Sequence, residues 1–305
     1  MTAPHVTFIL NPAAGRGKAL HIRRRLEEVL RRSSLDYTFL VTAGPGDATV
    51  KAREASAGSS VVVAVGGDGT VNETAAGVMG TGAALAVLSE GSGNDFARTI
   101  GAPSRPEAIV ERLHGYAVGH YDVGRAVLTH ADGRTDERWF FNSIGIGFDA
   151  AVARRVSAIR RLRGIPLYLT ALVQTIAGFA PRRGTITAPG VTRSEEFLVV
   201  CAGLGKWEGG GFKLTPDAVP DDGLFQICCA VGSSMREVVP VLPFTLTGRH
   251  IGRKHIVDLV TDRFTLALEG GFPVHGDGES FGTDVTTVEV SLVPGALKVV
   301  LPPGR

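Results

Sequence analysis

The chain is poor in cysteine, balanced in charge and free of long unbroken apolar runs, and each of these absences excludes a class of protein. Three cysteines, two of them adjacent, cannot build a disulfide framework and lack metal-ligand spacing. They favour a reducing cytosol and a packing role. Thirty-two basic residues against 30 acidic ones leave a formal charge of +2, so we expect no nucleic-acid partner.

Targeting and membrane-spanning signals are also absent. The N-terminal stretch MTAPHVTFILNP has no basic region ahead of an apolar core and no small-residue cleavage site, so we expect no signal peptide. The longest lipid-like run, residues 164–180, is short and is interrupted by Pro166, Gln174 and Gly178. With 44% apolar residues in 305, the chain predicts a globular cytoplasmic protein of one large domain or two ordinary ones.

The first third of the chain alternates apolar strand patterns with amphipathic helix patterns. Strands are predicted at residues 5–12, 36–42, 60–65 and 84–90, and helices at 19–32, 47–56 and from 71 onward. This alternation predicts a mostly parallel sheet with helices on both faces.

From about Tyr121 the pattern changes to strand-like runs separated by turns. These runs lie at residues 121–130, 137–146, 196–204, 222–231, 263–270 and 286–301. One helical insert is predicted at 149–179. We therefore expect a second, largely antiparallel β domain that begins near residue 122.

The stretch VVVAVGGDGTVNE, residues 61–73, places a glycine turn between a strand and a helix. In an open parallel sheet this junction lies at the carboxyl end of the strand, where ligands bind. Gly66, Gly67 and Gly69 let the backbone approach a phosphate, and the helix start adds N–H groups. Asp68 would repel phosphate unless a cation such as Mg²⁺ lay between them. The alternative is a tight turn in which Asp68 caps the helix.

A second polar cluster, SEGSGNDFART at residues 89–99, follows the next strand, and two adjacent loops of this kind favour one nucleotide site. Two familiar phosphate motifs do not fit. Pro12 and Ala19 depart from the P-loop pattern, and GIGFDA at 145–150 lacks the acid that a dinucleotide fold places about 20 residues further on.

Six segments resemble, in order, those of the diacylglycerol kinase-like lipid kinases, which include sphingosine and ceramide kinases and soluble bacterial lipid kinases. They are NPAAGRGKA, GGDGTVNE, GSGNDFAR, FNSIGIGFDA, GGGFKLTPDAVPDDGLF and GDGE. The match spans Asn11 to Glu279. GGDG also occurs in NAD kinases and phosphofructokinases, whereas NDFAR and PDDG are more specific.

The resemblance implies an α/β ATP-binding domain at 1–121, to which residues 294–305 return, and a β-sandwich lipid-binding domain at 122–293. A cleft would lie between them. It implies a kinase that uses ATP and Mg²⁺ to phosphorylate a lipid hydroxyl, with diacylglycerol as the first candidate. The implied nucleotide-binding residues are Asn11, Gly15, Thr42, Gly66, Gly67, Asp68, Gly69, Thr70, Asn72, Glu73, Ser92, Asn94 and Asp95.

The same resemblance implies a structural Mg²⁺ loop in PDAVPDDGLF. Asp222 would supply a carboxylate and Val219 and Leu224 backbone carbonyls, which are the oxygen ligands that Mg²⁺ prefers. Without the resemblance, a plain Asp-Asp-Gly turn is the simpler interpretation.

HGDGES places Asp277 and Glu279 on either side of Gly278. In an extended chain residues i and i+2 share a face, so both acids could point into one cleft. A surface hairpin turn is the alternative. The resemblance implies that one of the two is the general base for the lipid hydroxyl, with Asp277 favoured, and that Asp68 completes the catalytic set.

Positive charge for the γ-phosphate could come from Mg²⁺ or from Arg98, Lys206 or Lys213. The histidines, among them His250 and His275, are too scattered to be assigned as ligands. Two non-lipid alternatives remain, a NAD kinase of the same superfamily and a non-catalytic lipid- or nucleotide-binding protein.

A basic run followed by apolar residues, ARRVSAIRRLRGIPLYL, predicts contact with a membrane surface or, more commonly, a solvated helix face. A lipid substrate favours transient contact at the inner face of the membrane. A sphingoid base or another long-chain alcohol is the second candidate acceptor, and a homodimer is left open. The arginines of the run are Arg154, Arg155, Arg160, Arg161 and Arg163.

Overall fold

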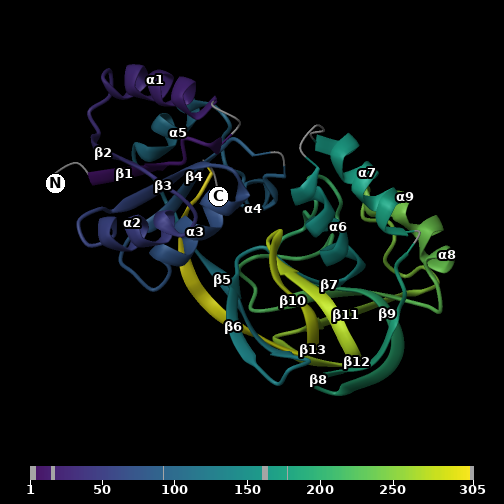
Figure 1. Cartoon of the computed structure of the whole chain (residues 1–305). Coiled ribbons are helices and arrows are strands. Elements are labelled where there is room, and N and C mark those ends of the chain that lie inside the picture. The colour runs from purple at the N-terminus through teal and green to yellow at the C-terminus, as the bar shows by residue number, and fades with distance from the viewer. Residues whose placement is uncertain (1–4, 15–17, 92, 160–163, 177, 303–305) are drawn as a thin grey trace. The chain divides into compact units, whose positions relative to one another are not determined.

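The computed structural model describes residues 5–14, 18–91, 93–159, 164–176 and 178–302 (Figure 1). The chain divides into two compact units. Unit 1 comprises Met1–Tyr121 and Pro294–Arg305, and unit 2 comprises Asp122–Val293.

Unit 1 is built on a parallel sheet. Its strands are β1 (His5–Leu10), β2 (Asp36–Val41), β3 (Val61–Gly66) and β4 (Ala84–Ser89). Its helices are α1 (Lys18–Leu30), α2 (Asp47–Ala55), α3 (Asp68–Val78), α4 (Asp95–Thr99) and α5 (Pro106–Leu113). The strand order is β2-β1-β3-β4 with parallel neighbours, which confirms the parallel sheet predicted from the alternation.

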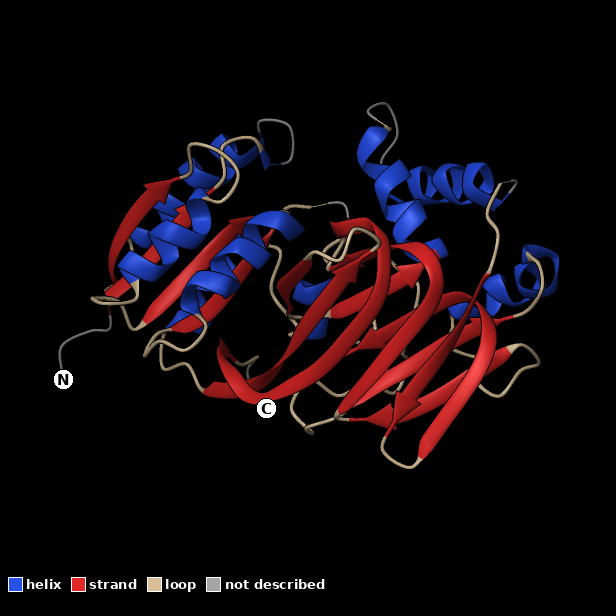
Figure 2. Ribbon diagram, turned by 60° about the horizontal axis from the view of Figure 1, so that its bottom comes forward, coloured by secondary structure: helices blue, strands red, loops and turns tan. Residues whose placement is uncertain are grey.

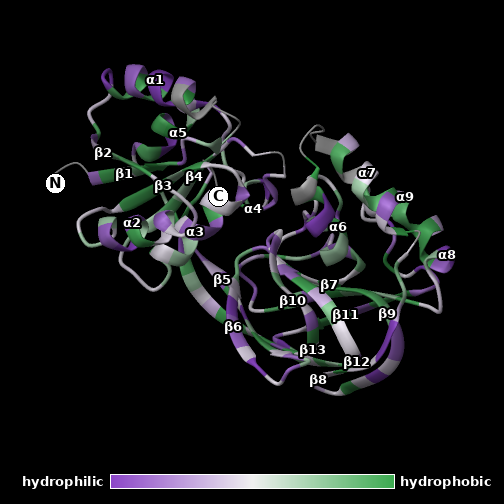
Figure 3. Cartoon of the chain, viewed as in Figure 1, coloured by the Kyte–Doolittle hydropathy of each residue, from purple (hydrophilic) through white to green (hydrophobic). Residues whose placement is uncertain are grey.

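The centre of this sheet is apolar because β3 is buried along its whole length. Its valines pack with residues of β1 and β4 and with the inner faces of α1 and α5. When both faces of a strand are covered, none of its side chains faces water, and its sequence can be a continuous apolar run. Figure 3 shows these strands in green, whereas α1 is largely purple.

The helix after β3 begins earlier than predicted. We expected it from residue 71, but α3 starts at Asp68, with Gly67 as the residue before its first turn. Gly67 has φ −89° and no side chain to cap the helix. The glycine turn is therefore very short, and Asp68 lies in the first helical turn.

The last strand, β13 (Glu279–Val300), begins in unit 2 and ends in unit 1. In unit 1, Val299 pairs in parallel with Leu85 of β4, and the N–H of Leu301 donates to the carbonyl of Ala117 at 2.9 Å. Val300 is buried in the core of unit 1.

Unit 2 consists mainly of antiparallel strands, drawn in red in Figure 2. β5 (Val118–His130) begins in unit 1 and continues into unit 2. The other strands of unit 2 are β6 (Thr135–Phe140), β7 (Ser143–Gly147), β8 (Arg182–Ala188), β9 (Val191–Gly203), β10 (Phe225–Val231), β11 (Ile256–Thr261) and β12 (Arg263–Gly276). The strand order β11-β10-β9-β7-β12-β13 has antiparallel neighbours, as predicted. Its core includes the buried rings of Phe140, Phe197, Phe225, Phe264 and Phe272.

The predicted helical insert forms two helices, α6 (Phe148–Ala158) and α7 (Gly164–Ile176), which pack on each other through a small apolar cluster. Three shorter helices follow β10: α8 (Met235–Val238), η2 (Val239–Val241) and α9 (Leu242–Thr245). Within the described parts of the chain, no helix combines the length and the apolar character needed to cross a membrane.

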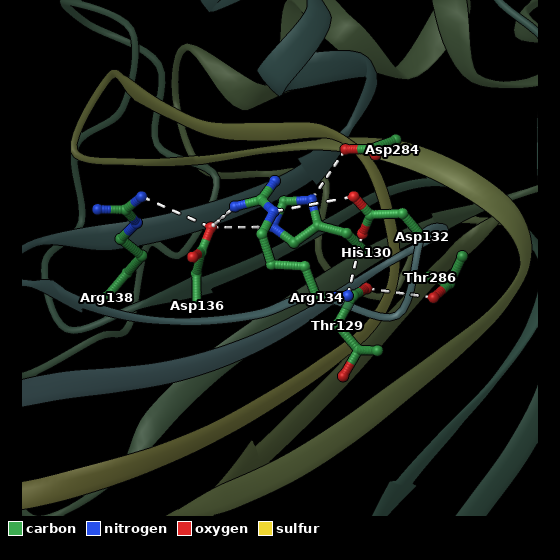
Figure 4. A network of polar contacts seen from close by, with 8 residues as sticks. All are labelled: Thr129, His130, Asp132, Arg134, Asp136, Arg138, Asp284 and Thr286. Atoms are coloured by element: carbon green, nitrogen blue, oxygen red, sulfur yellow. Dashed lines mark hydrogen bonds and ion pairs between the residues drawn. The ribbon is translucent and has the colours of Figure 1, made fainter.

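A charged network ties the β5–β6 hairpin to β13 (Figure 4). The buried ring of His130 places Nδ1 2.8 Å from Oδ1 of Asp284 and Nε2 3.1 Å from Oδ2 of Asp136. Arg134 donates to the same oxygen of Asp136 at 2.6 Å. Both ring nitrogens of His130 therefore face carboxylates, one from the hairpin and one from β13.

The three cysteines are free and buried, which confirms their predicted packing role. Cys201 of β9 lies opposite Cys228 of β10. Burial raises the pKa of Cys228 to about 12, so this thiol stays protonated and unreactive at neutral pH.

Candidate active site

The polar loops of unit 1 leave the sheet at one edge. Because β1, β3 and β4 are parallel, the loops at residues 11–14, 66–70 and 89–95 all follow carboxyl ends of strands. Backbone hydrogen bonds join neighbouring loops. The N–H of Asn11 donates to the carbonyl of Val65 at 3.1 Å, and that of Glu90 to Gly66 at 2.8 Å.

Asp68 connects the two glycine-rich loops. Its Oδ2 accepts the N–H of Asn94 at 3.0 Å, and its Oδ1 accepts that of Asp95 at 3.2 Å. The carboxylate therefore serves the start of α4 and makes no capping bond at its own helix, α3. This bridge explains why a carboxylate stands among glycines, whether or not a cation binds there.

The glycines of these loops allow the close approach that the bridge requires. A Cβ on Gly91 would lie only 3.0 Å from the α-carbon of Gly67. A Cβ on Gly66 would lie 2.6 Å from Oγ1 of Thr70. A larger residue at 91 would force the two loops apart, and one at 66 would displace Thr70 in the first turn of α3. The two loops thus form one structural unit at the edge of the sheet.

Two other predicted nucleotide-binding residues have structural partners. The side chain of Asn11 donates to Oγ1 of Thr70 at 2.9 Å and accepts a backbone N–H two residues further on. The carboxylate of Glu73 accepts the N–H groups of Gly46 and Ala48, at 2.8 and 3.1 Å, where α2 begins. Both side chains therefore hold loops together at this edge.

The chemistry of this edge suits an anion. The first turn of α3 has no side-chain cap, and helix N-termini favour negative groups such as phosphate. Thr42 directly follows β2 at the same edge of the sheet, and it is buried. Two predicted residues, Gly15 and Ser92, lie outside the described residues.

In unit 2, Asp277 has an unusual backbone conformation. Gly276 of β12 pairs with Glu279 of β13, so Asp277 and Gly278 form a two-residue hairpin turn. Their φ values are 51° and 84°, and two positive φ angles are the pattern of a type I′ turn. The predicted alternative of a hairpin turn is thus what the backbone adopts.

The expectation that Asp277 and Glu279 share a face of an extended chain is therefore wrong. The positive φ angles reverse the chain between them. Glu279 is the first residue of β13 and is exposed. Asp277 therefore lies within the turn and Glu279 directly after it, and the two acids have different surroundings.

The carboxylate of Asp277 points inward and binds the loop between β6 and β7. Its Oδ2 accepts the N–H of Phe141 at 2.7 Å, and its Oδ1 accepts those of Asn142 and Ser143, both at 2.9 Å. Burial raises the pKa of Asp277 to about 7, although the three N–H donors act in the opposite direction. A carboxyl group with this pKa can exchange a proton near neutral pH.

A cluster of buried polar side chains adjoins the same loop. Ser143 donates its hydroxyl to Oε2 of Glu208. Nε2 of His275 lies 3.6 Å from Oδ2 of Asp149 and 3.9 Å from Oε1 of Glu208. A Cβ on Gly145 would lie 2.1 Å from that Asp149 oxygen and 2.2 Å from Nε2, so only glycine leaves room for the pair.

The pKa of His275 is subject to opposing effects. Burial is the largest effect on its pKa and lowers it, whereas the carboxylates of Asp149 and Glu208 act in the opposite direction. The N–H of Gly278, however, points at Nδ1 from 3.1 Å, and a second proton on Nδ1 would face this donor. The hydrogen bond thus favours the neutral ring with its proton on Nε2.

No functional role was assigned from the sequence to the residues of this cluster. GIGFDA was tested only as a dinucleotide motif, and His275 was judged too scattered to assign. A signal was present, because Ser143, Gly145 and Asp149 lie within the segment FNSIGIGFDA that carries the family resemblance. The separation in sequence from Glu208 and His275 concealed the contact.

The predicted Mg²⁺ loop is exposed and internally bonded. Oδ1 of Asp222 accepts the N–H of Leu224 at 3.0 Å. The buried carboxylate of Asp122, which sequence reasoning missed, accepts the N–H of Gly223 at 2.8 Å and fixes the loop. Among the described residues, no group of three or more His, Cys, Asp or Glu side chains could hold a metal ion. The predicted Mg²⁺ site, in which the Asp222 carboxylate and the carbonyls of Val219 and Leu224 bind the ion, stays a prediction.

Comparison with known protein families matches nearly the whole chain. Residues 5–126 match the model of the diacylglycerol kinase catalytic domain. Residues 142–301 match that of the YegS C-terminal NAD kinase beta sandwich-like domain.

Curated relatives match over similar lengths. A "Diacylglycerol kinase" of Mycobacterium tuberculosis is 28% identical over 301 residues, covering 97% of this chain and 95% of that protein. A "Probable lipid kinase YegS-like" of Pseudomonas aeruginosa is 31% identical over 278 residues, covering 90% of this chain and 87% of that protein.

Solved structures share the fold. A crystal structure described as a diacylglycerol kinase from Bacillus anthracis aligns with a TM-score of 0.71 at 22% identity, covering 99% of this chain and 98% of that one. A second structure from the same organism reaches a TM-score of 0.78 at 24% identity, with 99% coverage of both chains. At these identities the likeness supports the fold alone.

Proposed function

Because the chain belongs to the diacylglycerol kinase-like lipid kinase family, we propose that it transfers the γ-phosphate of ATP to the free hydroxyl of diacylglycerol, giving phosphatidic acid. Kinase activity on a lipid follows from the family, whereas the identity of the acceptor is the proposal. The match of residues 5–126 to the diacylglycerol kinase catalytic domain supports this acceptor, and Asp277, an inward-pointing carboxylate on a fixed turn with a pKa of about 7, is the group suited to take its proton.

Unit 1 would bind the nucleotide at the carboxyl edge of its sheet. The α3 N-terminus and the backbone around Gly66, Gly67 and Gly69 would approach the phosphates, because glycines allow this contact and the helix dipole favours it. Asp68, Asn11 and Glu73 would act chiefly by holding the loops in register, through the bonds described above.

Magnesium fits the chemistry of this edge, since Asp68 and Asp95 offer the carboxylate oxygens that it prefers. Bound with ATP, it would neutralise charge that develops on the phosphates. The carboxylates would hold it near the loop that Asp68 and Asp95 already join.

Asp277 would receive the proton of the lipid hydroxyl. Its two oxygens accept three backbone N–H bonds, which fix the position of the carboxylate. Phosphoryl transfer has a loose transition state, so the carboxylate mainly orients the alcohol and takes its proton late. The three bonds to the loop at 141–143 would keep the carboxylate in that orientation.

Contact with a membrane surface is part of the proposal, because the acceptor resides in a bilayer. Arg154 and Arg155 are exposed on α6, and Val173 of α7 is 66% exposed. Positive and apolar groups together favour an anionic lipid surface. Arg160, Arg161 and Arg163 lie outside the described residues. We propose a cytoplasmic enzyme that visits the inner face of the membrane.

The test is transfer of label from γ-labelled ATP, with Mg²⁺, to parallel acceptors in mixed micelles: diacylglycerol, a sphingoid base, and NAD in solution. Label in phosphatidic acid, lost in Asp68→Ala, is the expected result. Preferential labelling of the sphingoid base would show that a sphingoid base, and not diacylglycerol, is the substrate. Label in NADP alone, or in no acceptor, would contradict the proposal.

A further inference from the structure

His275 is a buried residue whose two ring nitrogens face different parts of unit 2. Nδ1 accepts the N–H of Gly278 at 3.1 Å, from within the turn that carries Asp277. Among the described residues the buried Nε2 has no hydrogen-bond partner, and the carboxylate oxygens of Asp149 and Glu208 lie 3.6 and 3.9 Å from it. The ring thus links the turn to an acidic cluster.

The turn needs this support because its conformation is costly. Asp277 has φ 51°, in the left-handed region that non-glycine residues adopt at an energetic cost. The carboxylate bonds to residues 141–143 hold the turn from one side. Two bonds hold the backbone of the turn itself: the N–H of Asp277 donates to the carbonyl of Ser143 at 2.9 Å, and the N–H of Gly278 donates to Nδ1 of His275.

The acidic cluster determines which nitrogen of His275 carries the proton. A carboxylate near Nε2 favours an N–H there, because a carboxylate only accepts hydrogen bonds. The proton on Nε2 leaves the lone pair on Nδ1 to accept from Gly278. Oδ2 of Asp149 is buried and has no hydrogen-bond partner within the part of the chain that the structure describes, so it benefits from facing an N–H.

We propose that His275 is a positioning residue for Asp277: Nδ1 holds the turn through Gly278, while Asp149 and Glu208 keep the ring in the required tautomer. The inference rests on the proposed function, since Asp277 has its catalytic role only there. It also explains why Gly145 must be glycine, because any Cβ would push Asp149 and His275 apart.

Two substitutions separate the two nitrogens. In His275→Asn the side-chain oxygen can occupy the place of Nδ1 and accept from Gly278. In His275→Gln the amide reaches the place of Nε2, and the acceptor for Gly278 is lost. We expect His275→Asn to keep kcat within about threefold, and His275→Gln to lose about 10- to 100-fold, since displacement of a reacting group by about 1 Å has effects of this size. KM for ATP should not change, because unit 1 binds the nucleotide.

His250→Gln is the matched control, because His250 is equally buried in unit 2 and lies outside the cluster. Its Nε2 bonds to the carbonyl of Leu214 at 3.0 Å, and Gln can reproduce that contact. Wild-type kcat in this variant is expected. Equal losses of kcat in His275→Asn and His275→Gln, or wild-type kcat in His275→Gln, would overturn the inference.

A second measurement keeps the inference testable without activity. In wild-type protein, the nitrogen chemical shifts of His275 should show an unprotonated Nδ1, and the Gly278 amide should exchange slowly with solvent. A protonated Nδ1 or a rapidly exchanging Gly278 amide would overturn the inference. If wild-type protein phosphorylates no lipid, the proposed function fails while these spectra still decide the structural role of His275.

Discussion

Removing the carboxylate of Asp277 should unfold unit 2 more easily, in addition to any effect on catalysis. Asp277→Gly is the best perturbation, because glycine accepts the φ of 51° without strain and isolates the loss of the carboxylate. Three backbone N–H groups, those of Phe141, Asn142 and Ser143, lose their acceptor.

The magnitude follows from these three donors. A buried donor left without a partner costs about 1 to 3 kcal/mol. The three donors belong to buried residues, but the space left by the carboxylate adjoins the exposed residues 278–280 and can admit water, so the lower value applies. The sum is about 3 kcal/mol. Asp277→Asn should cost less, about 1 to 2 kcal/mol, because the amide oxygen can replace Oδ1 but the amide nitrogen cannot accept from Phe141.

Urea unfolding followed by tryptophan fluorescence measures this loss. Both tryptophans of the chain, Trp139 and Trp207, lie in unit 2, so the signal reports that unit alone. Glu289→Ala, an exposed change on β13, is the control and should stay within about 0.5 kcal/mol of wild type. If the Asp277→Gly variant had the same urea midpoint and the same dependence of unfolding free energy on urea as wild type, the reasoning would be refuted.

Two further predictions concern stability elsewhere in the chain. Gly77→Ala would place a Cβ 2.5 Å from the carbonyl of Thr49 and from Cβ of Ala52, so α2 and α3 must separate at a cost of about 1 to 3 kcal/mol; an unchanged melting temperature would contradict this packing. The hydrogen bond from His130 lowers the pKa of Asp284, so its stabilisation is present at neutral pH and is lost as pH falls through that lowered pKa. Asp284→Asn should therefore reduce stability at neutral pH and flatten its decline on acidification, and an unaltered pH profile of the melting temperature would exclude this role.

The sheet of unit 1 could be predicted because its physical signal is local. Val61 to Val65 form an unbroken apolar run, and only a strand covered on both faces explains such a run next to amphipathic helices. The start of α3 was harder to predict. Glycine and aspartate favour turns in isolation, and only the tertiary bonds from Asp68 to the start of α4 show why the helix begins there.

The polar cluster of unit 2 was not predicted because its contacts are distant in sequence. Asp149 and His275 meet over Gly145, and nothing within either segment indicates the other. Asp277 was expected as the general base from the family resemblance, but its contacts were not predicted, because an Asp-Gly pair by itself indicates an ordinary hairpin turn. Its inward carboxylate depends on a loop more than one hundred residues earlier.

The central claim is that Asp277 accepts the proton of the lipid hydroxyl. The most direct test is the turnover of Asp277→Asn with diacylglycerol and saturating ATP, under conditions in which the variant is folded, alongside its equilibrium affinity for ATP. The account predicts a fall in kcat of about 10²- to 10⁴-fold with unchanged ATP affinity. A kcat within about twofold of wild type would contradict it.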